Sequence, residues 1–120
     1  MKYLIMIFAN QETWAGFSSE ETARAIAEQD AINRDLFGTG ELLGAYGLAD
    51  AEASKVVRVR AGAAAVTDGP YLETKEHLAS YWLVDVETEQ RALEIAALMP
   101  FAAAGGVEVR PVLHEAGAEM

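Results

Sequence analysis

The chain has 120 residues, 52% of them apolar, so one domain with a single modest core is expected and disorder is not. Its formal net charge is −10, from 19 acidic and 9 basic residues, which argues against nucleic acid or an anionic membrane as a partner. It has no cysteine, so disulfides and thiolate zinc sites are excluded. No apolar stretch approaches the length of a bilayer span, and a cytoplasmic location is expected.

A strand and a long helix are predicted in the first third of the chain. Residues 2–9 are continuously apolar and flanked by polar residues, a pattern typical of a central strand buried on both faces. After a loop, Ser18 and Glu21 have the spacing of a helix capping box. The predicted helix runs to about Phe37, and a glycine just beyond that residue gives the expected end.

Apolar residues fall on two sides of this predicted helix. Asp30 lies on or beside the main stripe, and Ile32 and Leu36 form a second apolar edge. A carboxylate next to an apolar face is a candidate for chemistry, with simple solvation at the edge of the stripe as the alternative. The main stripe consists of Ala23, Ile26, Ala27 and Phe37.

The remainder of the chain predicts five strands and a second helix. Ala61-Gly62 suits the turn of a hairpin. In the strand that follows this hairpin, Tyr81 and Trp82 lie on opposite faces because successive strand residues alternate. Thr88 is placed to cap the second helix. The strands are predicted over residues 41–48, 55–60, 63–67, 77–86 and 107–113.

The order of these elements predicts an α+β fold. With the hairpin treated as an insertion, strand, helix, strand, strand, helix, strand is the ferredoxin-like, split βαβ order. One antiparallel sheet then carries both helices on one face. Its other face is also apolar, so a second copy is expected to cover it, giving a homodimer in the form of a dimeric α+β barrel. The single domain is expected to span residues 1–114, followed by a frayed tail over residues 115–120.

The densest group of ionisable residues follows the predicted hairpin. Asp68-Gly69-Pro70 is a turn pattern in which Gly69 can take a positive φ and Pro70 fixes its own φ. The runs on both sides are apolar, and both are expected to be buried strands. A charged, rigid loop between such strands is either a solvated turn or a site. Its ionisable residues are Asp68, Glu73, Lys75 and Glu76.

Paired carboxylates are the best candidates for chemistry in this loop. If Asp68 and Glu73 share a partly buried pocket, one of them can act as a general acid or base, and His77 can join them as a proton carrier. The alternative is a loop tied internally by an ion pair between Lys75 and a carboxylate. No motif for a nucleotide or other cofactor is present, and the two histidines have no metal-ligand spacing, so neither a cofactor nor a metal is expected.

The same loop carries a resemblance to a known family. Asp68-Gly69-Pro70-Tyr71 followed by Glu73-Thr74-Lys75-Glu76 resembles the signature of the DGPF-domain branch of the YCII-related proteins, with Tyr71 where phenylalanine is more usual. Residues 1–7 and 105–111 resemble the opening and closing strands of that family. The resemblance implies the ferredoxin-like fold and the pairing of two sheets.

One position departs from the family pattern. The resemblance implies a catalytic histidine in the first helix, paired with an aspartate, and that position falls near Gln29 in this sequence. A glutamine side chain cannot carry a proton between groups. Any catalysis would therefore have to use Asp30 or the loop of residues 68–76.

Two functions are compatible with these residues. The first is a protein that binds or transforms a small organic molecule in a pocket between sheet and helices, walled by aromatic residues. The second is a non-enzymatic regulatory or binding protein, and here the resemblance implies an extracytoplasmic-function sigma factor as a partner. For the first, the predicted catalytic residues are Asp68, Glu73 and Asp30, and the predicted ligand-binding residues are Lys75, Glu76, His77, Tyr81 and Trp14.

Overall fold

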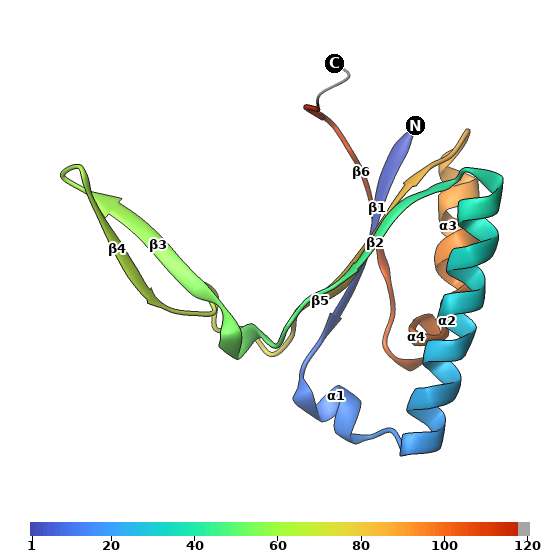
Figure 1. Ribbon diagram of the computed structural model, residues 1–120, viewed down its shortest axis with the longest axis horizontal. Coiled ribbons are helices and arrows are strands. Elements are labelled where there is room, and N and C mark those ends of the chain that lie inside the picture. The colour runs from blue at the N-terminus through green and yellow to red at the C-terminus, as the bar shows by residue number, and fades with distance from the viewer. Residues whose placement is uncertain (118–120) are drawn as a thin grey trace.

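The computed structural model describes residues 1–117 and has one four-stranded antiparallel sheet with helices on one face (Figure 1). The strands of this sheet are β1 (Lys2–Ala9), β2 (Leu42–Gly47), β5 (His77–Asp85) and β6 (Glu108–Pro111). The long helices are α2 (Ser19–Thr39) and α3 (Glu89–Leu98). The strand order is β2-β5-β1-β6, which with the helices in chain order is the ferredoxin-like arrangement. The predicted α+β fold is confirmed.

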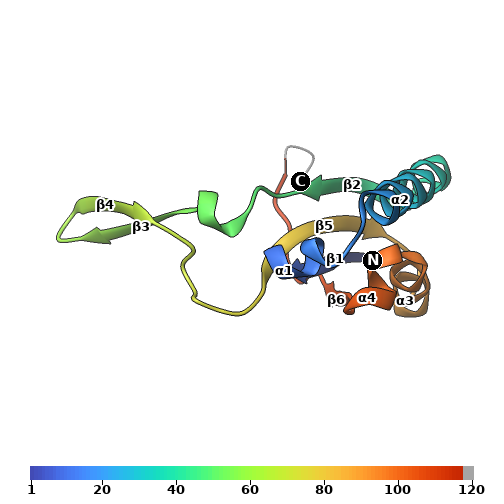
Figure 2. The same ribbon diagram turned by 90° about the horizontal axis from the view of Figure 1, so that it is seen from below.

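We call the four-stranded sheet and the helices packed on it the body. A separate two-stranded hairpin projects from the body (Figures 1 and 2). It consists of β3 (Lys55–Arg60) and β4 (Ala63–Asp68), and we call it the arm. Ala61 and Gly62 form its turn with φ of 51° and 79°, as a two-residue hairpin turn requires. Every residue of β4 is exposed, so the expectation of a buried strand before the charged loop is wrong. In the described part of the chain the arm has two strands and no layer packs on β4, so the alanines and the valine of β4 are exposed to solvent.

The core lies between the sheet and the two long helices. Alternate residues of β1 and β5 face the helices, including Ile5, Trp82 and Val84, and they meet Ile95 of α3. Ile5, Val84 and Ile95 are fully buried. Within the described residues no layer covers the opposite face of the sheet, so β1 is only partly buried on both faces, and Phe8 is 40% exposed.

Helix α2 packs through a different face from the one predicted. Ile32 and Leu36, the second apolar edge, face the core, whereas Ile26 and Phe37 of the main stripe are 54% and 53% exposed. The reason lies in the sheet. Trp82 brings a buried indole N–H that needs an acceptor, and Asn33 on the packed side of α2 supplies it at 3.1 Å.

Two short helices were not predicted, α1 (Gln11–Ala15) and α4 (Pro100–Ala104). The 3₁₀ turn η1 (Ala51–Ala53) lies where the sequence predicts a turn over residues 50–54. α1 begins at Asn10, whose side chain and that of Thr13 form a capping box. α4 begins with Pro100 at its first position, where the missing N–H costs nothing. Each of these segments is too short for helical periodicity to reveal it.

The expected tail, residues 115–120, is only partly described. Glu115 accepts two hydrogen bonds from the Lys2 ammonium at 2.9 and 2.7 Å, so this residue contacts the start of β1. Residues 118–120 lie outside the described part of the chain.

An ion pair joins the start of β2 to α3. Arg91 donates from Nε and Nη2 to the two carboxylate oxygens of Glu41, at 2.7 and 2.8 Å, in a parallel fork. These hydrogen bonds hold the pKa of the Glu41 carboxyl below its usual value, and they raise the pKa of Arg91. Glu41 is also held in place by the backbone, because its carbonyl accepts from the N–H of Asp85 at 2.8 Å.

We expect this pair to make stability depend on pH. The folded pKa of Glu41 is depressed, so its contribution is complete above the unfolded pKa of about 4.3 and is lost as pH falls through the folded value. Arg91→Gln should cost about 1 kcal/mol at pH 7, because both side chains are partly exposed, and the difference from wild type should shrink below pH 4. Urea unfolding at a series of pH values measures this, with Arg24→Gln on α2 as the control. A cost that stays constant across the series would contradict the expectation.

Candidate functional site

A cavity of about 810 Å³ lies where the body meets the base of the arm. Its walls come from the end of β1, α1, the segment around η1, the loop before β5 and the start of β5, which converge between body and arm in Figure 1. Its apolar lining includes Trp14, Leu48 and Leu78. The volume is within the range that accommodates small organic ligands.

Asn10 connects two of these walls. Its Oδ1 accepts from the N–H and the hydroxyl of Thr13, at 2.9 and 3.0 Å, and so starts α1. Its Nδ2 donates to the carbonyl of Lys75 at 3.0 Å, and so holds the loop before β5. One side chain therefore fixes the end of β1, the first turn of α1 and the loop relative to one another.

The loop of residues 69–76 is held by hydrogen bonds that involve its backbone groups. The N–H of Gly69 donates to the carbonyl of Ser54 at 2.8 Å, and the Thr74 hydroxyl donates to the carbonyl of Glu76 at 2.6 Å. Gly69 has no positive φ, so the predicted reason for glycine here is wrong. The actual reason is close approach, because a Cβ on Gly69 would lie 2.9 Å from the Cβ of Ser54.

His77 contributes a ring with a defined tautomer. Its Nε2 lies 2.8 Å from the carbonyl oxygen of Leu72. A carbonyl only accepts, so Nε2 carries the proton in this hydrogen bond, and the neutral ring keeps its lone pair on Nδ1. His77 lines the cavity, and Nδ1 is then the nitrogen that can accept a hydrogen bond.

Four of the predicted site residues line the cavity and four do not. Those that line it are Trp14, Glu73, Lys75 and His77. Glu76 belongs to the same loop but lies outside the lining. Asp68 ends the arm and forms an ion pair with Lys55. Catalytic roles for Asp68, Glu73 and Asp30 stay predictions, but the structure does not place these three carboxylates together.

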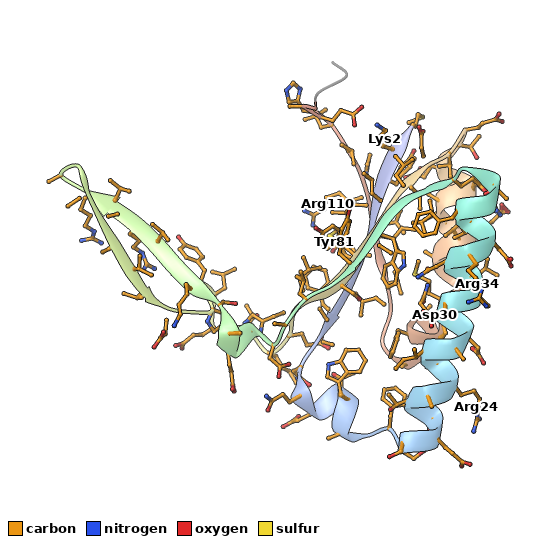
Figure 3. All side chains as sticks on the ribbon, in the orientation of Figure 1. Lys2, Arg24, Asp30, Arg34, Tyr81 and Arg110 are labelled. Atoms are coloured by element: carbon orange, nitrogen blue, oxygen red, sulfur yellow. The ribbon has the colours of Figure 1, made fainter. Side chains whose placement is uncertain are left out.

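Asp30 and Tyr81 lie on other surfaces of the body, as Figure 3 shows. Asp30 is exposed on α2, a helix that contributes no residue to the cavity. Tyr81 lies on the side of the sheet away from the helices, with its ring 5.1 Å from that of Tyr46. Helical and strand periodicity gave the faces of these residues but not their distance from the loop.

The pocket predicted between sheet and helices is not where the cavity lies. Core side chains fill that space, including the buried Trp82. The rings of Trp14 in α1 and Phe17 between α1 and α2 pack edge-on against Phe101 of α4. Their centroids lie 5.0 and 6.1 Å from that of Phe101. The aromatic residues that were expected to wall a pocket therefore pack with one another or with the core, and Trp14 alone among them reaches the cavity.

Sequence reasoning missed the acidic residues on the opposite wall. The lining includes Glu12 of α1, and Asp50 and Glu52 around η1, in addition to Glu73. Lys75 supplies the ammonium group of the lining. Gln11 donates to Asp50 at 3.5 Å and so connects α1 to the η1 segment. The available signal in the sequence was the polar run of residues 10–12 directly after a buried strand. The closeness of this run to residues 50–52 depends on the tertiary fold.

The loop is not tied by the predicted ion pair. Among residues 1–117, no carboxylate lies within ion-pair distance of the Lys75 ammonium. Within the same residues, no three histidine or acidic side chains gather in a way that would hold a metal ion. None of the helices in the described part of the chain has the length and apolar character of a membrane span.

The fold and the position of the cavity define a small ferredoxin-like α+β domain with an inserted hairpin arm. The family model described as YCII-related domain matches residues 1–116, and the chain belongs to this family. An uncharacterized protein of Rhizobium meliloti (strain 1021) is 31% identical over 114 residues, which cover 93% of this chain and 92% of that protein. Membership in the DGPF-domain branch stays a prediction.

Proposed function

We propose that this protein binds a small organic molecule with an apolar body and an amino group in the cavity at the base of the arm. The observation that carries the proposal is the composition of the lining, in which carboxylates surround an apolar surface that includes Trp14. Such a lining attracts a cation and shelters an aromatic or aliphatic group. The carboxylates are Glu12, Asp50, Glu52 and Glu73.

Lys75 extends the proposal to zwitterionic ligands. It supplies a positive charge next to Glu73 in the same loop, and no carboxylate neutralises it among residues 1–117. A ligand that carries an amino and a carboxylate group on one carbon can therefore contact both charges. His77 adds an imidazole whose Nδ1 can accept a hydrogen bond from a bound ligand. The predicted sigma-factor partner is a separate proposal, and binding in the cavity does not depend on it.

A series of three probes with one skeleton tests this proposal. We expect 2-phenylethylamine to bind, phenylalanine to bind more tightly, and 3-phenylpropanoate to bind most weakly. NMR titration of the Trp14 indole resonance measures each affinity directly. Glu73→Gln should weaken the two amines about fivefold, since an exposed ionic contact contributes up to about 1 kcal/mol. Lys75→Met should remove the advantage of phenylalanine over 2-phenylethylamine and leave the free energy of unfolding within about 0.5 kcal/mol of wild type.

Glu76→Gln is the matched control, because Glu76 lies in the same loop but outside the cavity lining. It should bind all three probes as the wild type does. The proposal fails if 3-phenylpropanoate binds as tightly as the amines, or if none of the probes shifts the Trp14 resonance. It also fails if Glu76→Gln and Glu73→Gln weaken binding equally, since the effect would then reflect net charge and not the cavity.

A further inference from the structure

The two faces of the arm differ in character. The register of β3 and β4 places Val57 opposite Val66 and Val59 opposite Ala64, so these four share one face. The other face carries Arg58 and Arg60 opposite alanines, and the Arg58 guanidinium stacks on the ring of Tyr71 at 5.3 Å. The three valines of the apolar face are 62%, 66% and 63% exposed. One face therefore has a contact within the chain, and among residues 1–117 nothing covers the apolar face.

A second apolar surface, on the body of the same chain, is only partly covered. The register pairs Met6 with Tyr81, Tyr46 with Tyr81, and Leu4 with Leu83, so these residues share the face of the sheet that is opposite the helices. We call it the open face. Tyr46 is 54% exposed and Leu4, Tyr81 and Leu83 are partly exposed, whereas Met6 is buried at 5%. The arm leaves the body on the side of the open face, but the arm extends away from the open face of its own chain (Figures 1 and 2).

The amount of exposed surface is too large for a compact monomer of this size. The accessible surface is 8397 Å², whereas surface scaling gives roughly 6,300 Å² for the mass of this chain. The radius of gyration is 16.6 Å, against about 14 Å for a compact domain of this length. The excess of about 2,000 Å² is comparable to what one protomer buries in an obligate dimer.

The charge of the arm also favours a partner like the chain itself. Residues 55–68 carry three of the nine basic residues and one of the nineteen acidic residues. The arm is therefore positive in a chain whose net charge is −10. Arg58 and Arg60 lie on the face of the arm opposite the apolar one, so they point away from a surface on which the apolar face docks. The net positive charge of the arm as a whole still offsets part of the repulsion between two acidic chains.

We propose that the apolar face of the arm packs on the open face of a second copy of this chain, with each copy covering the other. Both surfaces belong to one chain, both are apolar, and a two-stranded hairpin alone is marginally stable in water. The expected pairing of two sheets does not use the arm. Here the arm supplies the contact, and Val57, Val59 and Val66 are the residues that enter it.

Light scattering of two matched variants provides the first test. The wild type should have twice the 12.9 kDa mass of one chain at micromolar concentration. Val57→Thr with Val59→Thr keeps β-branched residues on the apolar face but adds hydroxyls, and it should raise the dissociation constant at least about tenfold. Ala63→Thr with Ala65→Thr places the same number of threonines on the opposite face and should leave it unchanged. A monomeric wild type, or a valine variant that dimerises as the wild type does, would overturn the proposal.

Hydrogen exchange identifies the surface on which the arm docks. Amides of residues 55–68 should be protected in the dimer and should lose that protection in Tyr46→Glu, although the sequence of the arm is unchanged. Leu98→Glu, at a position 56% exposed on α3, should leave the arm protected. Tyr46 is half-exposed in one chain, so this variant should fold, which the exchange of core amides in β1 verifies. Arm amides that exchange freely in the wild type, or that stay protected in Tyr46→Glu, would show that the open face is not the docking surface.

Discussion

Replacing Asn33 with leucine is expected to lower the free energy of unfolding by about 2–5 kcal/mol. The Oδ1 of Asn33 accepts from Nε2 of Gln29 at 2.9 Å and from Nε1 of Trp82 at 3.1 Å. Gln29 is 9% exposed and Trp82 is 5% exposed, so water reaches neither donor easily. Leucine has a similar volume but no acceptor, and it therefore leaves two buried donors without a partner. Chemical denaturation monitored by circular dichroism measures the loss.

Gln29→Leu is the matched control for this prediction. The Oε1 of Gln29 is buried and, within the described residues, has no hydrogen-bond partner. Leucine removes that unpaired acceptor and leaves the Trp82–Asn33 hydrogen bond intact, so Gln29→Leu should be within about 1 kcal/mol of wild type or more stable. Equal losses in the two variants would mean that packing, and not the hydrogen bonds to Asn33, accounts for the effect.

The second large effect is expected at the base of the arm. Gly69→Val should lower the free energy of unfolding by about 1–3 kcal/mol, because its Cβ would lie 2.9 Å from the Cβ of Ser54 and 3.2 Å from its backbone carbonyl atoms. Gly47→Val is the control, since nothing lies within 4 Å of a Cβ on Gly47. Thermal melts of both variants measure the difference. Equal melting temperatures would show that the contact between the loop and Ser54 relaxes without cost.

Much of the fold could be predicted because its signals are local. The capping box of Ser18 and Glu21 is present, with hydrogen bonds of 3.0 and 3.3 Å, and Gly40 ends α2 with a φ of 83°. Strand boundaries followed from runs of apolar residues, and the turn at Ala61-Gly62 followed from hairpin chemistry. These features depend on residues a few positions apart, which the sequence displays directly.

The packed face of α2 and the cavity could not be predicted in this way. Both apolar edges of α2 satisfied helical periodicity, and the choice between them depended on Trp82, which is 49 residues from Asn33. The cavity combines α1 with η1 and a loop more than fifty residues beyond α1, through contacts such as that of Asn10 with Lys75, 65 positions apart. The charged loop marked one wall correctly, but the opposite acidic wall needed the tertiary fold.

The cavity shares its walls between the body and the base of the arm, and this has a thermodynamic consequence. α1 and β5 belong to the body, whereas η1 and the loop after β4 lead into and out of the arm. If a second copy fixes the arm in one orientation, a ligand that prefers that orientation must strengthen the association of two chains by the same factor by which association strengthens ligand binding. The ratio of monomer to dimer would then report the concentration of the ligand.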